Sequence, residues 1–175
     1  MKIDILFLNN EMNGHDEYFD NDLFQEYCET HSFEGKKNQI LSVPPSYSKN
    51  ENLTFIVGLG ENKENINFYD LGTLIGTKIN SDAEIKFLNV VEDTNLIIDG
   101  ILYVQYKFNN YKSEDDSSVN NITFQDLDSS ENEIKKNSVF WVRDLINTPA
   151  LDKSPEEFIN KVRELVDSSG IEVEV

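Results

Sequence analysis

The chain has few of the residues from which catalytic and metal centres are usually built. Its 175 residues include one cysteine, Cys28, and two histidines, His15 and His31. A single cysteine excludes an internal disulfide, and in a plausible helix it is usually a small buried hydrophobe. The histidines lack metal-ligand spacing, and the acidic run at residues 114–116 lacks the pattern of a calcium loop. We therefore predict no catalytic and no metal-ligating residue.

Positive charge is also scarce. The chain carries 15 Lys and Arg against 33 Asp and Glu, a formal net charge of -18. Such a field repels phosphate groups instead of releasing their counterions. We therefore expect neither nucleic acid nor an anionic membrane as a partner.

Long hydrophobic runs are missing as well. No segment approaches the roughly 20 apolar residues of a membrane span. The apolar run at residues 3–8 is shorter than that of a signal peptide and contains Asp4. We therefore expect a cytoplasmic protein.

The residues that are present are sufficient for one folded domain. Hydrophobic residues make up 38% of the chain, including 11 Phe and 7 Tyr. Apolar runs of strand length occupy residues 3–8, 39–43, 53–57, 85–91 and 171–175. Helical spacing of apolar residues occurs over residues 68–79 and 158–166. This alternation predicts a layered α/β domain.

Local signals place some boundaries. Ser154, Pro155 and Glu157 form a helix start with a capping box, and they predict a helix to about residue 168. Pro149 predicts that a helix over residues 141–146 ends near residue 147.

Glycines and polar composition indicate the structure of the remaining segments. Gly72 and Gly76 lie four apart in the helix predicted over residues 68–79, where we expect them to bring that helix close to the sheet. Polar residues dominate 110–133 and predict an acidic loop, a short edge strand at residues 122–124 and a second polar connection. Residues 9–22 predict a loop.

Gly58 and Gly60 are the candidates for a ligand-binding loop. They follow a predicted strand and precede a helix, as glycines that cradle a phosphate do. Lys63 stands where a dinucleotide motif needs its third glycine, and Glu61 and Glu64 add negative charge. A tight strand-to-helix turn is the favoured interpretation, with phosphate binding as the alternative.

Several segments occur in an order that resembles one enzyme family. They read FIVGLG at residues 55–60, DLG at 70–72, YKFNNYKS at 106–113, WVRDLINTPA at 141–150 and SPEEF at 154–158. The fourth is similar to the Arg-Asp-Leu-x-Asn-Thr-Pro-Ala signature of the leucyl aminopeptidases of the M17 metallopeptidase family. In that family the signature ends the helix between the N-terminal and catalytic domains. The resemblance covers about residues 50–175.

The resemblance implies a fold and a division into domains. The implied fold is α/β, a three-layer α/β/α macro-like domain with a mixed, mostly parallel sheet. Residues 1–137 would be the N-terminal domain, and residues 138–175 the linker helix and the start of the catalytic domain.

The same resemblance argues against activity in this chain. In the family, a catalytic domain holds two divalent metals, zinc or manganese, and removes N-terminal amino acids from peptides. Its Asn-Thr-Asp-Ala-Glu-Gly-Arg motif is absent from this sequence, and no ligand can be assigned to a residue here. Two metals polarise the carbonyl and activate water, so a chain without them lacks the mechanism.

The sequence leaves three candidate functions for this chain. The favoured one is a non-catalytic N-terminal domain with a structural or assembly role, whose partner is the catalytic domain. The family forms hexamers, whereas we expect this chain to be monomeric or weakly associated. The alternatives are a macro-like module that binds ADP-ribose or another nucleotide, and a hydrolase that uses scattered carboxylates. Some family members bind DNA, but the net charge argues against that role here.

Overall fold

A computed structural model describes residues 1–61, 66–109, 111, 119–166, 171 and 174. The chain divides into two compact units, Met1–Lys136 and Asn137–Val175. No helix within the described residues combines the length and the apolar character needed to cross a membrane.

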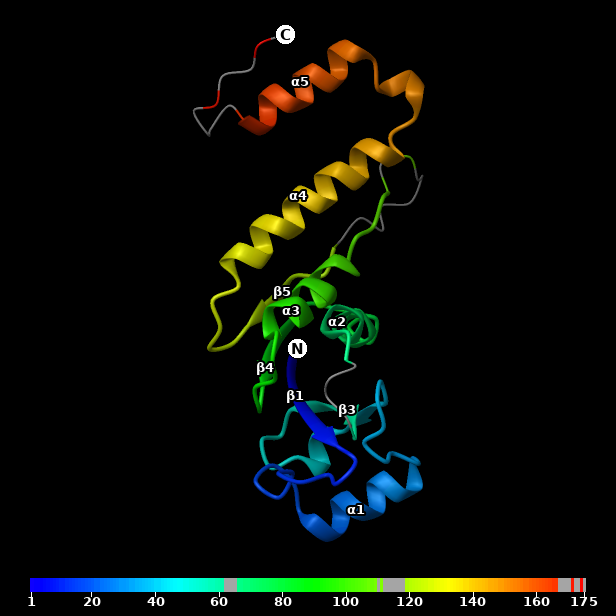
Figure 1. Ribbon diagram of the computed structural model, residues 1–175, viewed down its shortest axis with the longest axis vertical. Coiled ribbons are helices and arrows are strands. Elements are labelled where there is room, and N and C mark those ends of the chain that lie inside the picture. The colour runs from blue at the N-terminus through cyan, green and yellow to red at the C-terminus, as the bar shows by residue number, and fades with distance from the viewer. Residues whose placement is uncertain (62–65, 110, 112–118, 167–170, 172–173, 175) are drawn as a thin grey trace. The chain divides into compact units, whose positions relative to one another are not determined.

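The first unit is built on a five-stranded sheet (Figure 1). Its strands are β1 (Lys2–Asn9), β2 (Ile40–Val43), β3 (Leu53–Gly60), β4 (Ala83–Phe87) and β5 (Ile122–Phe124). They lie in the order β2-β3-β1-β4-β5. All neighbouring pairs are parallel except β2 and β3. The predicted mixed, mostly parallel sheet of an α/β fold is confirmed, including the short edge strand at residues 122–124.

Five α-helices accompany the strands in the described part of the chain. They are α1 (Asn21–Thr30), α2 (Phe68–Gly76), α3 (Thr94–Tyr103), α4 (Ser130–Asn147) and α5 (Pro155–Val166). Short 3-10 turns occupy Pro45–Tyr47 and Ala150–Asp152. Helix α4 begins in the first unit and ends in the second. Its end at Asn147 agrees with the stop predicted from Pro149.

The sheet is covered on both faces, because alternate residues of a strand point to opposite sides. On one face Ile3, Ile5 and Phe7 of β1 pack in a core with α2 and α3. On the other, Leu6 and Leu8 pack with α1. The first unit is therefore a three-layer α/β/α structure. Burying each such side chain contributes about 1.5–3 kcal/mol.

The glycines of α2 do not have the role that we expected. A Cβ at Gly72 would lie 2.1 Å from the carbonyl oxygen of Ile97 in α3, and one at Gly76 would lie 2.4 Å from Val104. Gly100 of α3 shows the reciprocal contact, 2.2 Å from the carbonyl oxygen of Tyr69. The expectation that these glycines bring α2 close to the sheet is therefore wrong. They allow the two helices on the same face of the sheet to touch along their backbones.

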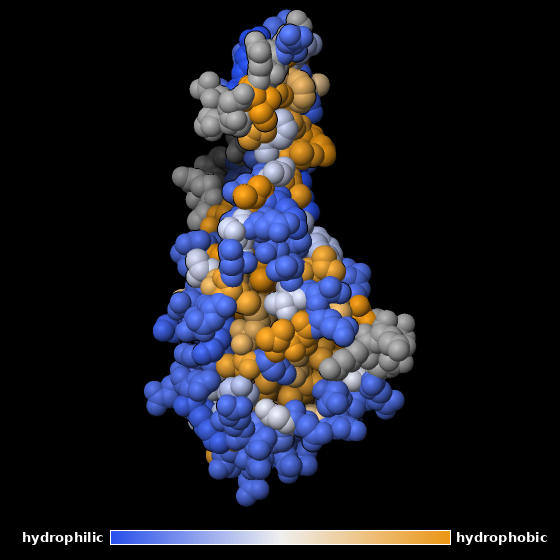
Figure 2. Space-filling view, turned by 60° about the vertical axis from the view of Figure 1, so that its left-hand side comes forward, coloured by the Kyte–Doolittle hydropathy of each residue, from blue (hydrophilic) through white to orange (hydrophobic). Residues whose placement is uncertain are grey.

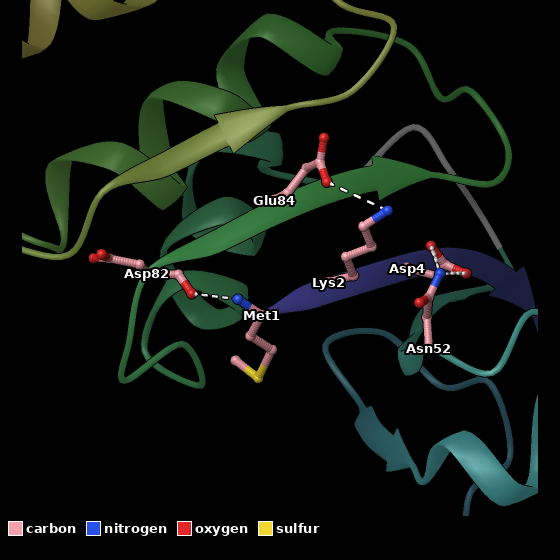
Figure 3. Close-up of polar contacts among 6 residues, drawn as sticks. All are labelled: Met1, Lys2, Asp4, Asn52, Asp82 and Glu84. Carbon is pink, nitrogen blue, oxygen red and sulfur yellow. Dashed lines mark hydrogen bonds and ion pairs between the residues drawn. The ribbon is translucent and has the colours of Figure 1, made fainter.

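Polar contacts hold the amino ends of the central strands (Figure 3). Asp4 on β1 is 2% exposed, and its carboxylate accepts hydrogen bonds from the side-chain amides of Asn50 at 3.1 Å and Asn52 at 3.3 Å. Lys2 and Glu84 form an exposed ion pair across β1 and β4 at 3.8 Å. Asp4 therefore fixes the turn that leads into β3, and its buried charge is satisfied by amides.

The end of β4 differs from the predicted strand over residues 85–91. The strand ends at Phe87, although Leu88 still donates its backbone N–H to Ile5. After this point the side chain of Asn89 makes the hydrogen bonds to β1 that a longer strand would make. Its amide accepts from the backbone N–H of Phe7 at 2.9 Å and donates to the carbonyl of Phe7 at 2.7 Å. Backbone pairing stops here because the Asn89 side chain already bonds with the backbone N–H and carbonyl of Phe7.

Two polar segments also contain more structure than their composition indicated. In the predicted loop over residues 9–22, Phe19 is 1% exposed and forms a bridge with Ser48. In the predicted polar connection, residues 130–133 form the first turn of α4, where Asn132 is 3% exposed. The strand predicted over residues 171–175 and the predicted helix end at residues 167–168 fall largely outside the described residues.

Candidate functional site

Gly58 and Gly60 lie within β3 and not in a turn after it. A Cβ at Gly58 would meet the carbonyl oxygen of Lys36 at 2.1 Å, because the backbone at Gly35 and Lys36 crosses the strand there. Gly60 has a φ of +75° and donates its N–H to the carbonyl of Gly35 at 2.9 Å. This close crossing explains why both positions are glycine, since a side chain there would meet the crossing backbone. Glu61 is exposed, whereas Lys63 and Glu64 lie outside the described residues.

Polar contacts within the chain bridge the place where an open α/β sheet usually binds its ligand. Among the parallel strands, β1 leads to β3 on one side and β4 lies on the other, so the strand order reverses between β1 and β4. Ligands bind outside the carboxyl ends of strands at such points. Here Asn89 bonds to Phe7 of β1, and the Tyr18 hydroxyl donates to the carbonyl of Leu88 at 2.9 Å. These contacts tie the segment after β4 to the end of β1 and to Tyr18.

The residues of potential chemical interest lie apart. His15 stacks on Phe24 at 4.4 Å, and its Nε2 is buried without a hydrogen-bond partner among the described residues. His31 stacks on Tyr27 at 4.1 Å. Cys28 is 2% exposed, and burial raises the pKa of its thiol to about 11. These environments are those of packing residues and not of a nucleophile.

Metal ligands are not gathered in the part of the chain that the structure describes. No group of three or more His, Cys, Asp or Glu side chains is arranged there to hold an ion. The acidic run at residues 114–116 lies outside the described residues.

The second unit contains the more informative surface. Its helix α5 begins as its sequence predicts: the Ser154 hydroxyl accepts from the backbone N–H of Glu157 at 3.2 Å. The Lys153 ammonium donates to the carbonyl of Leu145 at 2.7 Å, which ties the start of α5 to the end of α4. The helices are therefore joined by defined polar contacts.

These helices nevertheless leave apolar side chains uncovered. None of the described residues of α5 is buried, and Phe158 and Leu165 are 45% and 54% exposed. Ile146 of α4 is 70% exposed and Leu151 is 96% exposed. Figure 2 shows hydrophobic surface, in orange, on the second unit at the top of the view. An amphipathic helix gains most of its stability from a covered apolar face, which α5 lacks here.

A groove lies within this apolar surface. It has a volume of ≈ 390 Å³ and is lined by Leu145, Ile146, Lys153, Ser154, Pro155 and Phe158. We call these six residues the α4–α5 groove. Exposed apolar patches of this kind occur at interaction surfaces and ligand grooves, so this groove is the candidate site of the second unit. The helical spacing in the sequence identified α5, but it could not show that its apolar face is uncovered.

Comparisons with known proteins agree with the resemblance seen in the sequence. No family model matches the chain. A probable cytosol aminopeptidase from Clostridium tetani is 24% identical over 182 aligned residues, which cover 89% of this chain and 36% of that protein. The chain therefore spans little more than a third of the length of this curated relative.

Solved structures show the same fold. The cytosol aminopeptidase of Coxiella burnetii has a TM-score of 0.69 and 20% identity, over 96% of this chain and 36% of that one. The bottromycin maturation enzyme BotP has a TM-score of 0.71 and 14% identity, over 98% and 38%. A tomato leucine aminopeptidase mutant has a TM-score of 0.67 and 14% identity, over 95% and 39%. The resemblance to the N-terminal domain of leucyl aminopeptidases is confirmed.

Proposed function

We propose that this chain acts as a non-catalytic N-terminal domain of the leucyl aminopeptidase type, with a structural or assembly role. Its partner would be a metallopeptidase catalytic domain, on the same polypeptide or on another. The observation that carries the proposal is the α4–α5 groove, an uncovered apolar surface in a chain that matches 36% of an aminopeptidase.

The groove supports this partner through its position in the sequence. The resemblance assigns residues 138–175 to the linker helix and the start of the catalytic domain, and the groove residues lie in that part of the chain. A catalytic domain that packed on Ile146, Leu151 and Phe158 would remove about 25 cal/mol of unfavourable hydration for each Å² of apolar area covered. Apolar side chains, and not charges, would therefore provide most of the interface.

The chemistry of peptide hydrolysis would belong to the partner. Two divalent metals, zinc or manganese, would polarise the peptide carbonyl and activate water there. The described residues of this chain have no comparable cluster of ligands. We also propose a cytoplasmic location, in keeping with a relative named a cytosol aminopeptidase, and a monomeric or weakly associated state for the chain alone.

The first experiment measures hydrolysis of leucine p-nitroanilide by the purified chain, with and without added zinc or manganese, together with its mass in solution. We expect no hydrolysis from a monomer or a weakly associated species. Turnover that requires metal, is blocked by a chelator and follows this chain through purification would contradict the proposal.

The second experiment tests the groove. The catalytic portion of the Clostridium tetani aminopeptidase serves as the probe, and binding is measured by analytical ultracentrifugation. Phe158→Asp places a charge in the groove, where an interface would bury it, so binding should weaken by at least about tenfold. Leu74→Asp is the matched control, because Leu74 is a 38% exposed apolar residue on α2. If the two substitutions weakened binding equally, the groove would not be part of the interface.

A further inference from the structure

A second, smaller cavity lies in the first unit, at the carboxyl ends of β4 and β5. It has a volume of ≈ 160 Å³ and is lined by Lys86, Phe87, Val90, Thr94, Gln125, Asp126 and Leu127. Figure 2 shows apolar surface, bordered by hydrophilic side chains, on the first unit. Loops that follow parallel strands are the usual place for a ligand in this class of fold.

Apolar side chains form much of the cavity. The ring of Phe87 stacks with the rings of Phe7 at 5.8 Å and Phe124 at 6.0 Å, so neighbouring residues hold it in place. Val90 is 83% exposed and Leu127 is 38% exposed. A ligand with an apolar group would cover these two side chains and gain the free energy of removing them from water.

The polar lining contains one charge of each sign. Lys86 and Asp126, whose side chains carry opposite charges, are both among its lining residues. Neither side chain forms an ion pair or a hydrogen bond with another residue in the described ranges of the chain. The Thr94 hydroxyl donates to the carbonyl of Val91 at 2.9 Å, so its oxygen can still accept a hydrogen bond. A ligand that offers both charges would find a partner for each.

The volume limits the size of the ligand. Cavities for drug-sized ligands begin at about 300 Å³. This cavity is smaller than that, which favours a ligand of about the size of one amino acid over a nucleotide.

We propose that this cavity binds a free α-amino acid with an apolar side chain, such as leucine. The ligand's carboxylate pairs with Lys86, its ammonium pairs with Asp126, and its side chain covers Val90 and Leu127. A zwitterion with one apolar side chain offers a group to each of these three features. This inference stands on the cavity alone and does not depend on the proposed function.

Titration of the ¹⁵N-labelled full chain with L-leucine, followed by ¹H–¹⁵N correlation spectra, tests the inference. We expect saturable shifts of the backbone amides at residues 86–94 and 125–127, with a dissociation constant on the order of 1 mM. N-acetyl-leucine lacks the ammonium, leucinamide lacks the carboxylate and glycine lacks the side chain. Each of these should bind at least about fivefold more weakly, the scale of one partly exposed contact.

Variants assign the charges. Lys86→Met should weaken leucine binding about fivefold and abolish the preference for leucine over leucinamide, and Asp126→Asn should abolish the preference over N-acetyl-leucine. Lys78→Met and Asp22→Asn are matched controls, because both positions are exposed and lie outside the cavity. The inference is overturned if leucine causes no saturable shift at 20-fold the expected constant, or if its shifts lie elsewhere. Equal binding of leucine and its two neutralised analogues would overturn it as well.

Discussion

Gly72 of α2 lies against the backbone carbonyl of Ile97 in α3, so closely that a Cβ on Gly72 would stand 2.1 Å from that oxygen. Gly100 returns the contact from α3, where a Cβ would stand 2.2 Å from the carbonyl oxygen of Tyr69. Neither position has room for a methyl group, because backbone atoms cannot rotate away. The two helices therefore cover one face of the sheet as a closely packed pair.

Substitution of Gly72 by alanine should destabilise the first unit. Alanine favours a helix by about 1 kcal/mol over glycine, but forcing a methyl group into a filled space costs about 1–3 kcal/mol and more against rigid backbone. We expect the free energy of unfolding to fall by about 2 kcal/mol, as measured by urea denaturation.

Leu74→Ala is the control for this prediction, since Leu74 lies on the same helix and is 38% exposed. That change should cost less than about 1 kcal/mol. If Gly72→Ala stabilised the protein, the helices would have room to separate and the close contact would not be required.

The first turn of α4 is attached to α3 by a buried hydrogen bond. The Asn132 side chain donates to the Asp99 carboxylate at 2.7 Å and to the carbonyl of Asn95 at 3.1 Å. Asn132 and Asp99 are 3% and 8% exposed. Asn132→Ala should therefore lower the free energy of unfolding by about 2 kcal/mol, because it leaves a buried carboxylate without its donor.

A double-mutant cycle with Asp99→Ala separates this bond from the loss of packing. We expect a coupling energy of about 1–2 kcal/mol between the two sites in urea denaturation. Additive effects would mean that the two side chains are stabilised independently.

The sequence predicted the elements whose own residues determine them. Apolar runs located four of the five strands, and the short apolar island gave β5. Ser154 and Pro155 predicted the start of α5 because a helix cap is a local interaction. The resemblance to aminopeptidases added the mixed, mostly parallel character of the sheet, whereas the order of its strands came only from the structure.

Other features depended on contacts between distant residues. Helix α3 was not predicted, because Ile97, Ile98 and Ile101 are β-branched and Gly100 is a weak helix former. Packing against α2 and the sheet stabilises it. The sequence at the start of α4 predicts a polar connection, because asparagine is usually a surface residue. The structure shows that Asn132 is buried through its hydrogen bond to Asp99. The α4–α5 groove could not be predicted, since spacing shows that a helix has an apolar face and not whether another part of the protein covers it.

The single cysteine should react slowly in the folded protein. Burial raises the pKa of Cys28 from its ordinary 9.0 to about 11, so at pH 8 the thiolate is about a hundredfold rarer than in an unfolded chain. Labelling with a thiol reagent should therefore be slower in buffer than in urea by at least that factor, because the reagent must also reach a buried side chain. Equal rates in the two solvents would show that α1 opens easily.

The same pKa shift predicts how stability depends on pH. A folded-state pKa raised above the unfolded value contributes stability below about pH 9, and this contribution is lost as the pH rises to about 11. Burial also raises the pKa of Tyr18 and Tyr27, with the same sign. The Cys28→Ala variant should show a shallower loss of stability over this range, by up to about 2 kcal/mol. Urea denaturation at pH 8 and pH 10.5 measures the difference.

The N-cap of α5 offers a test of the second unit. The Ser154 hydroxyl accepts the backbone N–H of Glu157 at 3.2 Å, and Ser154→Ala removes that acceptor. A lost N-cap costs about 1 kcal/mol, which is large for a helix with no buried side chain among its described residues. We expect a several-fold loss of hydrogen-exchange protection at residues 157–162, with no change in the first unit. Ser154→Thr keeps an acceptor and should restore most of the protection. If both variants exchanged like the wild type, contacts between α4 and α5 would hold the helix without its cap.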